Sequence, residues 1–406
     1  MSRMSFLPLG LLALATLSSS APSGPAKSTS KKHCIDLEVS VPVEADQWRY
    51  DQPHIDSNID AMDWHVNVTT PSAAPFSERR IGDTKQHIKE TFKISAKLCV
   101  PSKKTEKSSI LQIASPGQAF DKRYFDVEID PKEYSYIDAA IGKGYAVLAY
   151  DRLGTGASSK PDAYDVLQLP VDTELLASLT RIARDGKLIS SSKVLSKHSK
   201  KTAEFDFTPS KTVHIGHAYG AFLMIQMLGK YGTISDGALI TGVYPNKYMA
   251  PEQMLTVLNY NHAYVKELDP KRFADYGSGY FVLDNEQTLQ KLFYQKESLD
   301  PALLKYTDEI KQPESVGQYA SEFDLEASQA SEFKAPVMFF TGELDNFICK
   351  GDCNDLYDED MARYLFPSAT DIKPYLQPKG GHATGLSRGA SAGYEVMLNY
   401  LDSKGL

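Results

Sequence analysis

Apolar residues along this chain fall into short runs that alternate with longer segments of helix-forming composition. The short runs predict buried strands, and they lie at 110–114, 145–150, 212–216, 238–243 and 336–341. The helical segments lie at 134–142, at 173–184 and directly after Gly220. Residues 34–100 alternate apolar and polar positions in pieces and predict the first strands. Strands that alternate with helices predict a mostly parallel sheet covered by helices on both faces.

The pattern changes between residues 245 and 333, where helical and aromatic positions dominate and no run is typical of a long core strand. This segment predicts a helical unit that divides an α/β core into two parts, 34–244 and 334–406. Its aromatic residues include Tyr248, Tyr260, Tyr264, Tyr276, Tyr280, Phe281, Phe293 and Tyr294. They either line a lid over an apolar pocket or pack the core of the unit itself.

Residues 1–20 are typical of a secretory signal peptide, with Arg3 ahead of a short apolar stretch and small residues at its end. Residues 21–33 are rich in Ser, Pro and Lys and predict a disordered linker. Asn67 begins an Asn-Val-Thr sequon, which predicts N-glycosylation on a surface loop. Together these features predict a secreted protein.

The four cysteines fit an oxidising compartment. Cys349 and Cys353 are close enough in sequence for a local disulfide, and Cys34 and Cys99 lie in strand-like segments that we expect to be neighbours. We predict the pairs Cys34–Cys99 and Cys349–Cys353, although the sequence alone allows three connectivities.

Charge and motif spacing exclude several classes of partner. The net charge is −8, so we expect no basic face that attracts nucleic acid. No apolar run reaches the about 20 residues that cross a bilayer. The loop 154–159 lacks the third glycine of a dinucleotide motif, and no histidine stands at ligand spacing beside Cys349. We therefore expect no nucleotide, metal or other cofactor, and we expect Asp151 and Arg152 to brace a loop.

The segment 213–221, Val-His-Ile-Gly-His-Ala-Tyr-Gly-Ala, combines an apolar strand, a sharp turn and the start of a helix. Gly216 and Gly220 match both glycines of G-x-S-x-G, a motif in which the serine is a nucleophile. Small residues are needed there because the chain nearly touches itself at such a turn. Ala218 occupies the serine position, and a methyl group cannot attack a carbonyl.

Three further motifs complete a resemblance to the α/β-hydrolases. Residues 145–158 are similar to the fourth strand and following loop of that superfamily, and residues 336–345 resemble the strand that ends in the triad acid. Gly380-Gly381-His382 lies where the triad histidine belongs, in the expected order of nucleophile, acid and histidine. The resemblance covers roughly residues 100–400 and is greatest to secreted fungal members of the AB hydrolase-1 type. It implies an α/β-hydrolase fold with a helical cap inserted after the sixth strand.

The resemblance also implies a role for two ionisable residues. His382 would take a proton through one ring nitrogen, and Asp345 would accept a hydrogen bond from the other and thereby set the tautomer. Glu343 is the alternative acid, because strand alternation places it on the same face as Asp345. The family pattern G-x-x-D favours Asp345.

An oxyanion hole needs two N–H groups. The resemblance assigns one to Tyr219 and the other to the loop after residue 114. That loop normally starts His-Gly, whereas here it reads Ser115-Pro-Gly-Gln118. The departure leaves the second donor open between Gln118, which we expect first, and Ala119.

Two interpretations of Ala218 remain open. Either the chain is an ester, lactone or amide hydrolase whose serine has been replaced to trap a ligand, or the alanine is natural. A natural alanine would mark a protein that binds, condenses or cyclises a secondary-metabolite intermediate with the His382–Asp345 pair. Neither Ser115 nor His217 is expected to replace the nucleophile. The aromatic segment favours a small apolar partner molecule, and nothing in the sequence indicates an oligomeric state.

Overall fold

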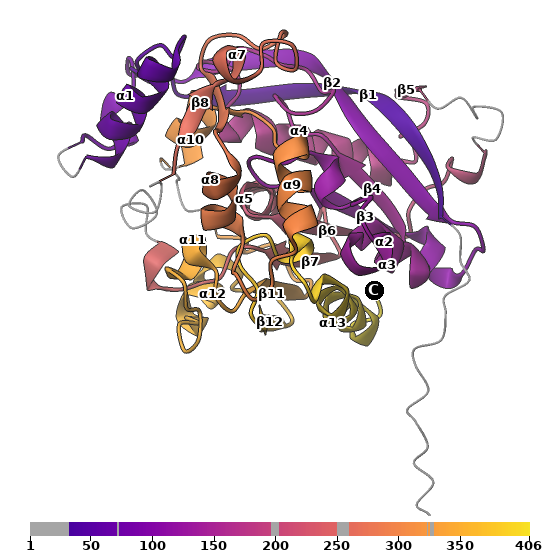
Figure 1. The fold of residues 1–406 in the computed structure, drawn as a ribbon. Coiled ribbons are helices and arrows are strands. Elements are labelled where there is room, and N and C mark those ends of the chain that lie inside the picture. The colour runs from indigo at the N-terminus through magenta and orange to yellow at the C-terminus, as the bar shows by residue number, and fades with distance from the viewer. Residues whose placement is uncertain (1–31, 71–72, 196–202, 250–259, 323, 325–328) are drawn as a thin grey trace, which may run out of the picture.

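A computed structural model describes residues 32–70, 73–195, 203–249, 260–322, 324 and 329–406 (Figure 1). The predicted signal peptide and the predicted linker up to residue 31 lie outside the described residues. Strand β1 begins at Lys32, so the last two residues of the predicted linker belong to a strand.

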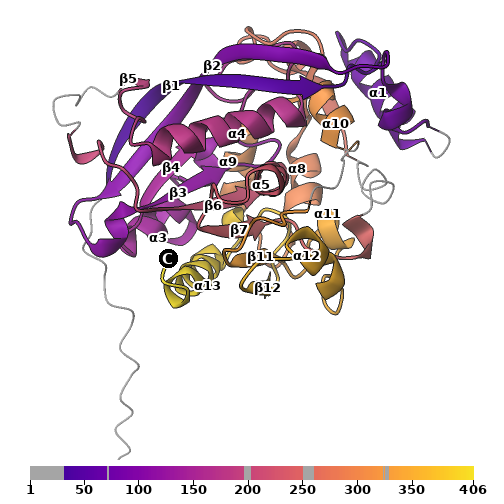
Figure 2. The same cartoon turned by 180° about the vertical axis from the view of Figure 1, so that it is seen from behind.

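A nine-stranded sheet forms the centre of the described chain, in the order β12-β11-β7-β6-β3-β4-β2-β1-β5 (Figure 2). Its strands are β1 Lys32–Gln47, β2 Gln86–Pro101, β3 Ile110–Ser115, β4 Ala146–Tyr150, β5 Ser192–Val194, β6 Lys211–His217, β7 Gly237–Thr241, β11 Val337–Gly342 and β12 Ile372–Gln377. The strands from β4 to β12 in this order pair in parallel. β2 pairs antiparallel with β4 and β1, and β5 pairs antiparallel with β1.

The predicted strands of the core are present, with ends that differ from the prediction by one or two residues. Every residue of β3, β4, β7 and β11 is buried. Burial on both faces explains why these strands are continuous apolar runs and could be found from the sequence. β12 is half-buried and contains Lys373 and Pro374, so it carried no such signal.

Helices cover both faces of the sheet, as the alternation of elements predicted. α4 packs against α5 on one face, and α3 packs against α13 on the other (Figure 2). The helices of the core are α2 Pro131–Tyr134, α3 Tyr136–Gly142, α4 Leu169–Arg184, α5 Tyr219–Lys230, α11 Asn346–Cys349, α12 Glu359–Leu365 and α13 Ala390–Ser403. Short 3-10 helices lie at Phe76–Arg79, Glu106–Ser109, Lys122–Tyr124, Lys247–Met249 and Thr384–Leu386.

Two helix predictions differ from the structure at their ends. The predicted helix 134–142 is divided at Ser135, whose side chain accepts the N–H of Asp138 and so begins α3 anew. α4 begins at Leu169, four residues before the predicted start, with Pro170 in the first turn, where a missing N–H costs nothing.

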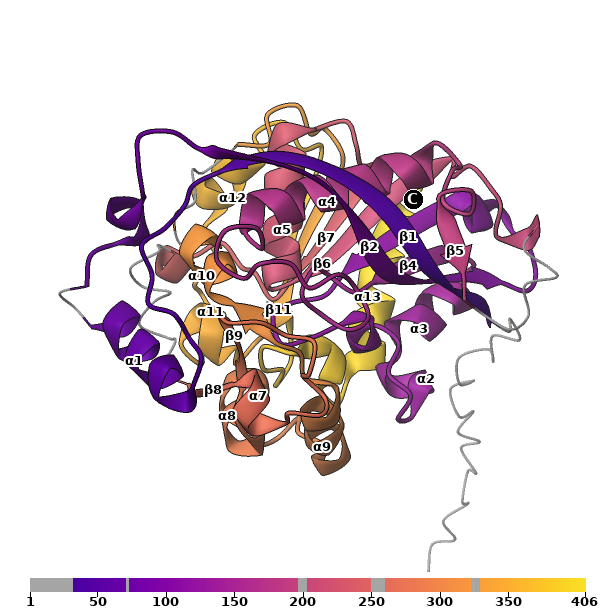
Figure 3. The same cartoon turned by 90° about the horizontal axis from the view of Figure 1, so that it is seen from above.

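The chain between β7 and β11 contains a second, smaller sheet as well as the predicted helices. Its elements are β8 His262–Tyr264, α7 Val265–Leu268, β9 Tyr280–Leu283, α8 Glu286–Phe293, α9 Pro301–Ile310, β10 Glu314–Ser315 and α10 Val316–Glu322. The strands form an antiparallel sheet in the order β10-β9-β8, which the sequence did not predict. β7 is the seventh strand along the chain because the three-residue β5 precedes it. β8 also contacts α1, Asn58–Thr69, so two insertions into the core meet there (Figure 3).

Both predicted disulfides are present. Cys34 and Cys99 face each other directly in the β1–β2 pairing and are 65 residues apart in sequence, whereas Cys349 and Cys353 are four apart. The sequon residue Asn67 is exposed, but it lies in the last turn of α1 rather than on the predicted loop. Within the described ranges, no helix has the length and apolar character needed to cross a membrane.

Removing the Cys34–Cys99 bridge is expected to lower the free energy of unfolding by about 4 kcal/mol, because loop-closure entropy grows with the size of the closed loop. The short Cys349–Cys353 loop should contribute about 2 kcal/mol by the same relation. Urea unfolding of the double variants Cys34→Ala/Cys99→Ala and Cys349→Ala/Cys353→Ala would measure both. A larger loss from the short loop would contradict this account.

Candidate active site

The turn between β6 and α5 is strained at Ala218. Its φ of 48° and ψ of −116° lie outside the regions that residues with a Cβ normally adopt. The turn is held by backbone hydrogen bonds: the N–H of Ala218 donates to Thr241 at 2.9 Å, and its carbonyl accepts the N–H of Ala221 at 2.8 Å. Ala218 is half-buried, whereas His217 and Tyr219 on either side are buried. Residue 218 is therefore the accessible point of the turn.

Gly216 and Gly220 are required by close contacts between backbone segments. A Cβ on Gly216 would lie 2.5 Å from the carbonyl oxygen of Gly220. A Cβ on Gly220 would lie 2.2 Å from the carbonyl oxygen of Ser115. Both distances are too short for any side chain, which is the physical reason for the glycine spacing in the sequence.

Asp345 follows β11 and begins α11 as its capping residue. Its Oδ1 accepts the N–H groups of Phe347 and Ile348, each at 2.9 Å, and its Oδ2 accepts the hydroxyl of Thr341 at 2.7 Å. The side chain is completely buried. These donors stabilise a buried carboxylate that would otherwise be costly.

His382 completes the hydrogen bonding of Asp345. Its Nδ1 lies 2.7 Å from Oδ2 of Asp345, so Nδ1 carries the proton and Nε2 is left as the basic nitrogen. The loop that carries His382 contacts the end of β11, because a Cβ on Gly342 would lie 2.2 Å from the carbonyl oxygen of Gly381. This contact between two backbones explains the glycine at 342, and Gly381 is required because a Cβ there would lie 2.6 Å from the carbonyl oxygen of Phe293.

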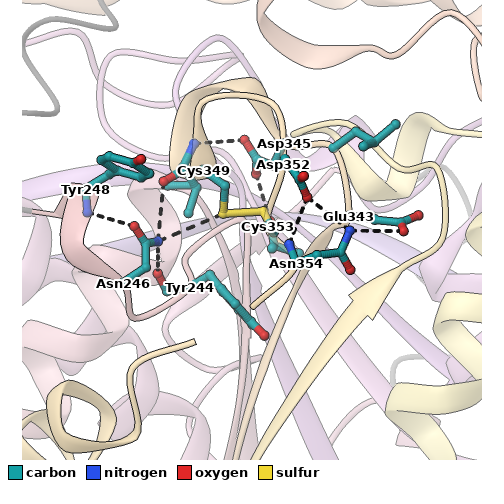
Figure 4. The surroundings of a disulfide bond; sticks show 12 residues. Tyr244, Asn246, Tyr248, Glu343, Asp345, Cys349, Asp352, Cys353 and Asn354 are labelled. Atoms are coloured by element: carbon teal, nitrogen blue, oxygen red, sulfur yellow. Dashed lines mark hydrogen bonds between the residues drawn. A yellow bond between two sulfur atoms is a disulfide. The ribbon is translucent and has the colours of Figure 1, made fainter. Parts of the chain in front are cut away.

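Glu343, the alternative acid, has other partners. Its carboxylate accepts the N–H of Lys379 at 2.9 Å and a side-chain N–H of Asn354 at 3.3 Å, and the residue is half-buried (Figure 4). Of the two acids that the sequence offered, the structure pairs Asp345 with His382.

A disulfide between Cys349 and Cys353 closes the turn that follows α11, the helix that Asp345 caps (Figure 4). The N–H groups of Cys349 and Gly351 donate to the carbonyl of Asp345 at 3.1 and 3.0 Å. The N–H of Cys353, at the other end of the bridge, donates to the carbonyl of Glu343 at 2.8 Å. The Cys349–Cys353 bridge thus stabilises the position of the acid.

His217 links the turn to the His382–Asp345 pair. Its ring centroid lies 5.1 Å from that of His382, and its ring stacks on Tyr124 at 4.5 Å. Its Nδ1 lies 3.2 Å from the hydroxyl of Thr241. Burial first, and then the neighbouring His382, lower the pKa of His217 well below 6.5. His217 is therefore neutral, and no second positive charge opposes protonation of His382.

Two backbone N–H groups near Ala218, those of Tyr219 and Gln118, donate to no acceptor within the described part of the chain. The intervening Gly117 contacts the turn, since a Cβ there would lie 3.1 Å from Cβ of Ala218. The buried side chain of Arg152 holds the loop 115–118 by two hydrogen bonds. Its Nε donates to the carbonyl of Pro116 at 2.9 Å, and its Nη2 donates to the carbonyl of Gly117 at 3.0 Å.

The other sequence features have structural roles. Ser115 is buried, and its hydroxyl lies 3.0 Å from that of Tyr150. The loop 154–159 folds around Asp151, which accepts the N–H of Ala157 at 3.1 Å and would lie 2.3 Å from a Cβ on Gly156. Asp151 therefore braces this loop as expected, whereas Arg152 contributes its backbone carbonyl, which accepts the hydroxyl of Thr155 at 2.9 Å, and its side chain binds the loop after β3 instead.

The aromatic residues predicted between 245 and 333 mostly pack the interior. Tyr260, Tyr264, Tyr276, Tyr280, Phe281, Phe293 and Tyr294 are buried, and Tyr248 is half-buried. Phe293, at the end of α8, stacks on the ring of His382 at 6.1 Å. One aromatic residue of this segment therefore lies directly at the candidate site.

A buried polar cluster near this site was missed by the sequence analysis. Nε2 of His65 lies 2.5 Å from Nδ1 of His262, whose Nε2 lies 3.3 Å from the carboxylate of Glu314. Tyr319 donates its hydroxyl to Glu314. Burial, followed by the charge of His262, lowers the pKa of His65 to about 3. His65 and His262 are 197 residues apart and lie in no motif, so no sequence signal could have joined them.

Glu322, at the end of α10, is close enough to Glu314 of this cluster for the charge of Glu314 to act on it. The side-chain N–H of Gln118 donates to Oε2 of Glu322 at 3.1 Å. Among the described residues, no group of three His, Cys, Asp or Glu side chains has a geometry that could hold a metal ion.

Strand order, the antiparallel β2 and the strained β6–α5 turn define a protein of the α/β-hydrolase fold. No family model matches the sequence, and no curated protein matches it. The solved structures that resemble it include an esterase from Thermogutta terrifontis with malate bound, which is 12% identical with a TM-score of 0.47 and covers 77% of this chain and 94% of its own.

Two other solved structures are similarly distant. The enol-lactonase from Burkholderia xenovorans LB400 is 11% identical with a TM-score of 0.46 and covers 77% of this chain and 97% of its own. A bromoperoxidase from Bacillus anthracis is 15% identical with a TM-score of 0.44 and covers 77% of this chain and 96% of its own. Likenesses at this distance carry no argument about the reaction.

Proposed function

We propose that this protein binds a small apolar ester, lactone or amide over Ala218 and that, as written, it does not hydrolyse the bound molecule. The observation that carries the proposal is the strained backbone of Ala218, which is retained beside the His382–Asp345 pair. These two features support a site of serine-hydrolase type in which the nucleophilic hydroxyl is missing.

The proposed roles follow from the chemistry of each group. The carbonyl oxygen of the ligand would accept the N–H groups of Tyr219 and Gln118, which stabilise negative charge that develops there. His382 would act as a base through Nε2, with Asp345 fixing its tautomer. Ala218 offers no nucleophile, so no acyl-enzyme can form and the ligand would leave unchanged.

A second candidate function is catalysis without a covalent step, such as condensation or cyclisation of a secondary-metabolite intermediate. The observation that favours it is the hydrogen bond from His382 to Asp345, which fixes the orientation and the tautomer of the imidazole ring. A base whose Nδ1 proton is held by Asp345 at 2.7 Å can take a proton from carbon or oxygen without a serine.

The setting of the site is also proposed. We infer that residues 1–20 are a cleaved signal peptide, that the protein is secreted and that Asn67 carries a glycan. The two disulfides fit an oxidising compartment, and Asn67 is exposed. We infer that residues 245–333 act as a cap, which is supported by the contact of Phe293 with His382.

Binding without turnover is the expected result when the protein is mixed with p-nitrophenyl butyrate. Calorimetry should show saturable binding of the intact ester, and absorbance should show nitrophenolate release no faster than from His382→Ala. Rapid release that depends on His382 would reveal another nucleophile. Failure to bind esters, lactones and amides of this size would exclude the proposed function.

A further inference from the structure

Glu322 is a buried carboxyl group held by a rigid element. Every residue of α10, which it ends, is buried. Ser321 accepts the N–H of Leu169 at 2.8 Å, and the side chain of Gln318 donates to Asp172 at 2.9 Å. These bonds fix the end of α10 against the start of α4, so the position of the Glu322 carboxyl is set by the fold rather than by a loop.

The surroundings of Glu322 favour its neutral form. Within the described part of the chain, the side chain of Gln118 is its one hydrogen-bond donor. Glu314 of β10 adds a nearby negative charge, while Arg152 acts in the opposite direction. Burial first, and then Glu314, raise the pKa of Glu322 to about 8, so the carboxyl is protonated at pH 7.

The surroundings of Asp345 differ from those of Glu322 in the number of hydrogen-bond donors. Asp345 is equally buried, but it has four hydrogen-bond donors where Glu322 has one. Glu322 therefore lacks the set of donors that surrounds Asp345, and its burial favours the neutral acid.

Gln118 places Glu322 beside the half-buried part of the site. Gln118 and Ala218 are half-buried, although the residues around them are buried. Gly117 contacts the turn, and Gln118 follows it. The residue that holds the Glu322 carboxyl therefore borders the place where the carbonyl of a ligand would lie.

We propose that Glu322 is a catalytic acid and that the protein transfers protons on an enolisable carbonyl compound, with Glu322 protonating the carbonyl oxygen while His382 takes a proton from the adjacent carbon. This inference rests on the proposed carbonyl site. It specifies proton transfer as the reaction of the second candidate function, catalysis without a covalent step. Proton transfer needs no nucleophile at residue 218.

The step balances without another reactant. The C–H bond breaks, its proton goes to Nε2 of His382 and its electron pair forms the C=C bond. The π pair of the carbonyl moves to oxygen, which takes the proton of Glu322 to give the enol. Return of the proton from His382 to carbon and of the enol proton to Glu322 restores both groups, with the substrate unchanged or isomerised.

The protonation state can be tested without any substrate. Protein labelled with ¹³C at the glutamate carboxyl carbons should show one carboxyl that titrates near pH 8 and is absent in Glu322→Gln. The neighbouring variant Glu314→Gln removes a negative charge and should move that titration to lower pH. If every glutamate titrates below pH 6, the inference is overturned.

The reaction can be tested by deuterium incorporation into phenylacetone in D₂O, followed by proton NMR. We expect exchange above the buffer rate, abolished in His382→Ala and at least about 10-fold slower in Glu322→Gln with KM unchanged. The decline in rate above pH 8 should disappear in Glu322→Gln and shift to lower pH in Glu314→Gln. Glu343→Gln is the matched control and should leave the exchange rate unchanged.

The outcomes separate this inference from the proposed function. Exchange that needs His382 but is unaffected in Glu322→Gln overturns the role of Glu322. Absence of exchange in the parent protein, together with ester hydrolysis by Ala218→Ser, overturns proton transfer but leaves the carbonyl site standing. If Glu322→Gln does not fold, Glu322→Met replaces it, with thermal unfolding as the check.

Discussion

Replacing Ala218 by serine is expected to raise the turnover of short p-nitrophenyl esters by about 10⁴-fold. Removing a triad nucleophile costs on the order of 10⁶ in turnover, and the remaining groups retain a smaller advantage over water. The backbone at residue 218 already has the strained conformation of a nucleophile, and His382 is oriented by Asp345. One hydroxyl should therefore recover much of the loss. Initial rates of nitrophenolate release measure it.

The control combines Ala218→Ser with His382→Ala. If the gain depends on the proposed base, the double variant returns to the rate of the parent protein. If Ala218→Ser folds and binds ester but remains inert, the site is not arranged for acyl transfer, and the second candidate function becomes the better one.

In the Ala218→Ser background, Asp345→Asn is expected to lower turnover by about 10⁴-fold. Oδ1 of Asp345 accepts the N–H groups of Phe347 and Ile348, so the amide oxygen of an asparagine would take that place. Its NH₂ group would then face Nδ1 of His382. Nδ1 would become an acceptor, the ring proton would move to Nε2, and the base could no longer accept the serine proton.

Glu343→Gln is the matched control for the acid. Its carboxylate binds Lys379 and Asn354, so we expect turnover within about twofold of Ala218→Ser alone, as for a surface change away from the reacting groups. Loss of activity in Glu343→Gln with little effect from Asp345→Asn would reverse the assignment of the acid.

The central strands could be predicted because their physical cause is local. β3, β4, β7 and β11 are buried on both faces, so each had to be a short continuous apolar run. The small sheet β8-β9-β10 could not be predicted, because its strands have four residues or fewer and pair across a long segment. Strands of that length give no periodicity.

The amino-acid sequence by itself determined the α/β-hydrolase fold and the absence of a hydroxyl at residue 218, whereas the cysteine pairing, for which the sequence allows three connectivities, was decided by the tertiary structure. The fold and the missing hydroxyl depend on motif order, on apolar runs and on the identity of one side chain. The choice between Glu343 and Asp345 needed the tertiary structure, because strand alternation places both on the same face and only the surrounding donors distinguish them. The neutral state of Glu322 likewise depends on burial and on Glu314, which act through space and leave no pattern along the chain.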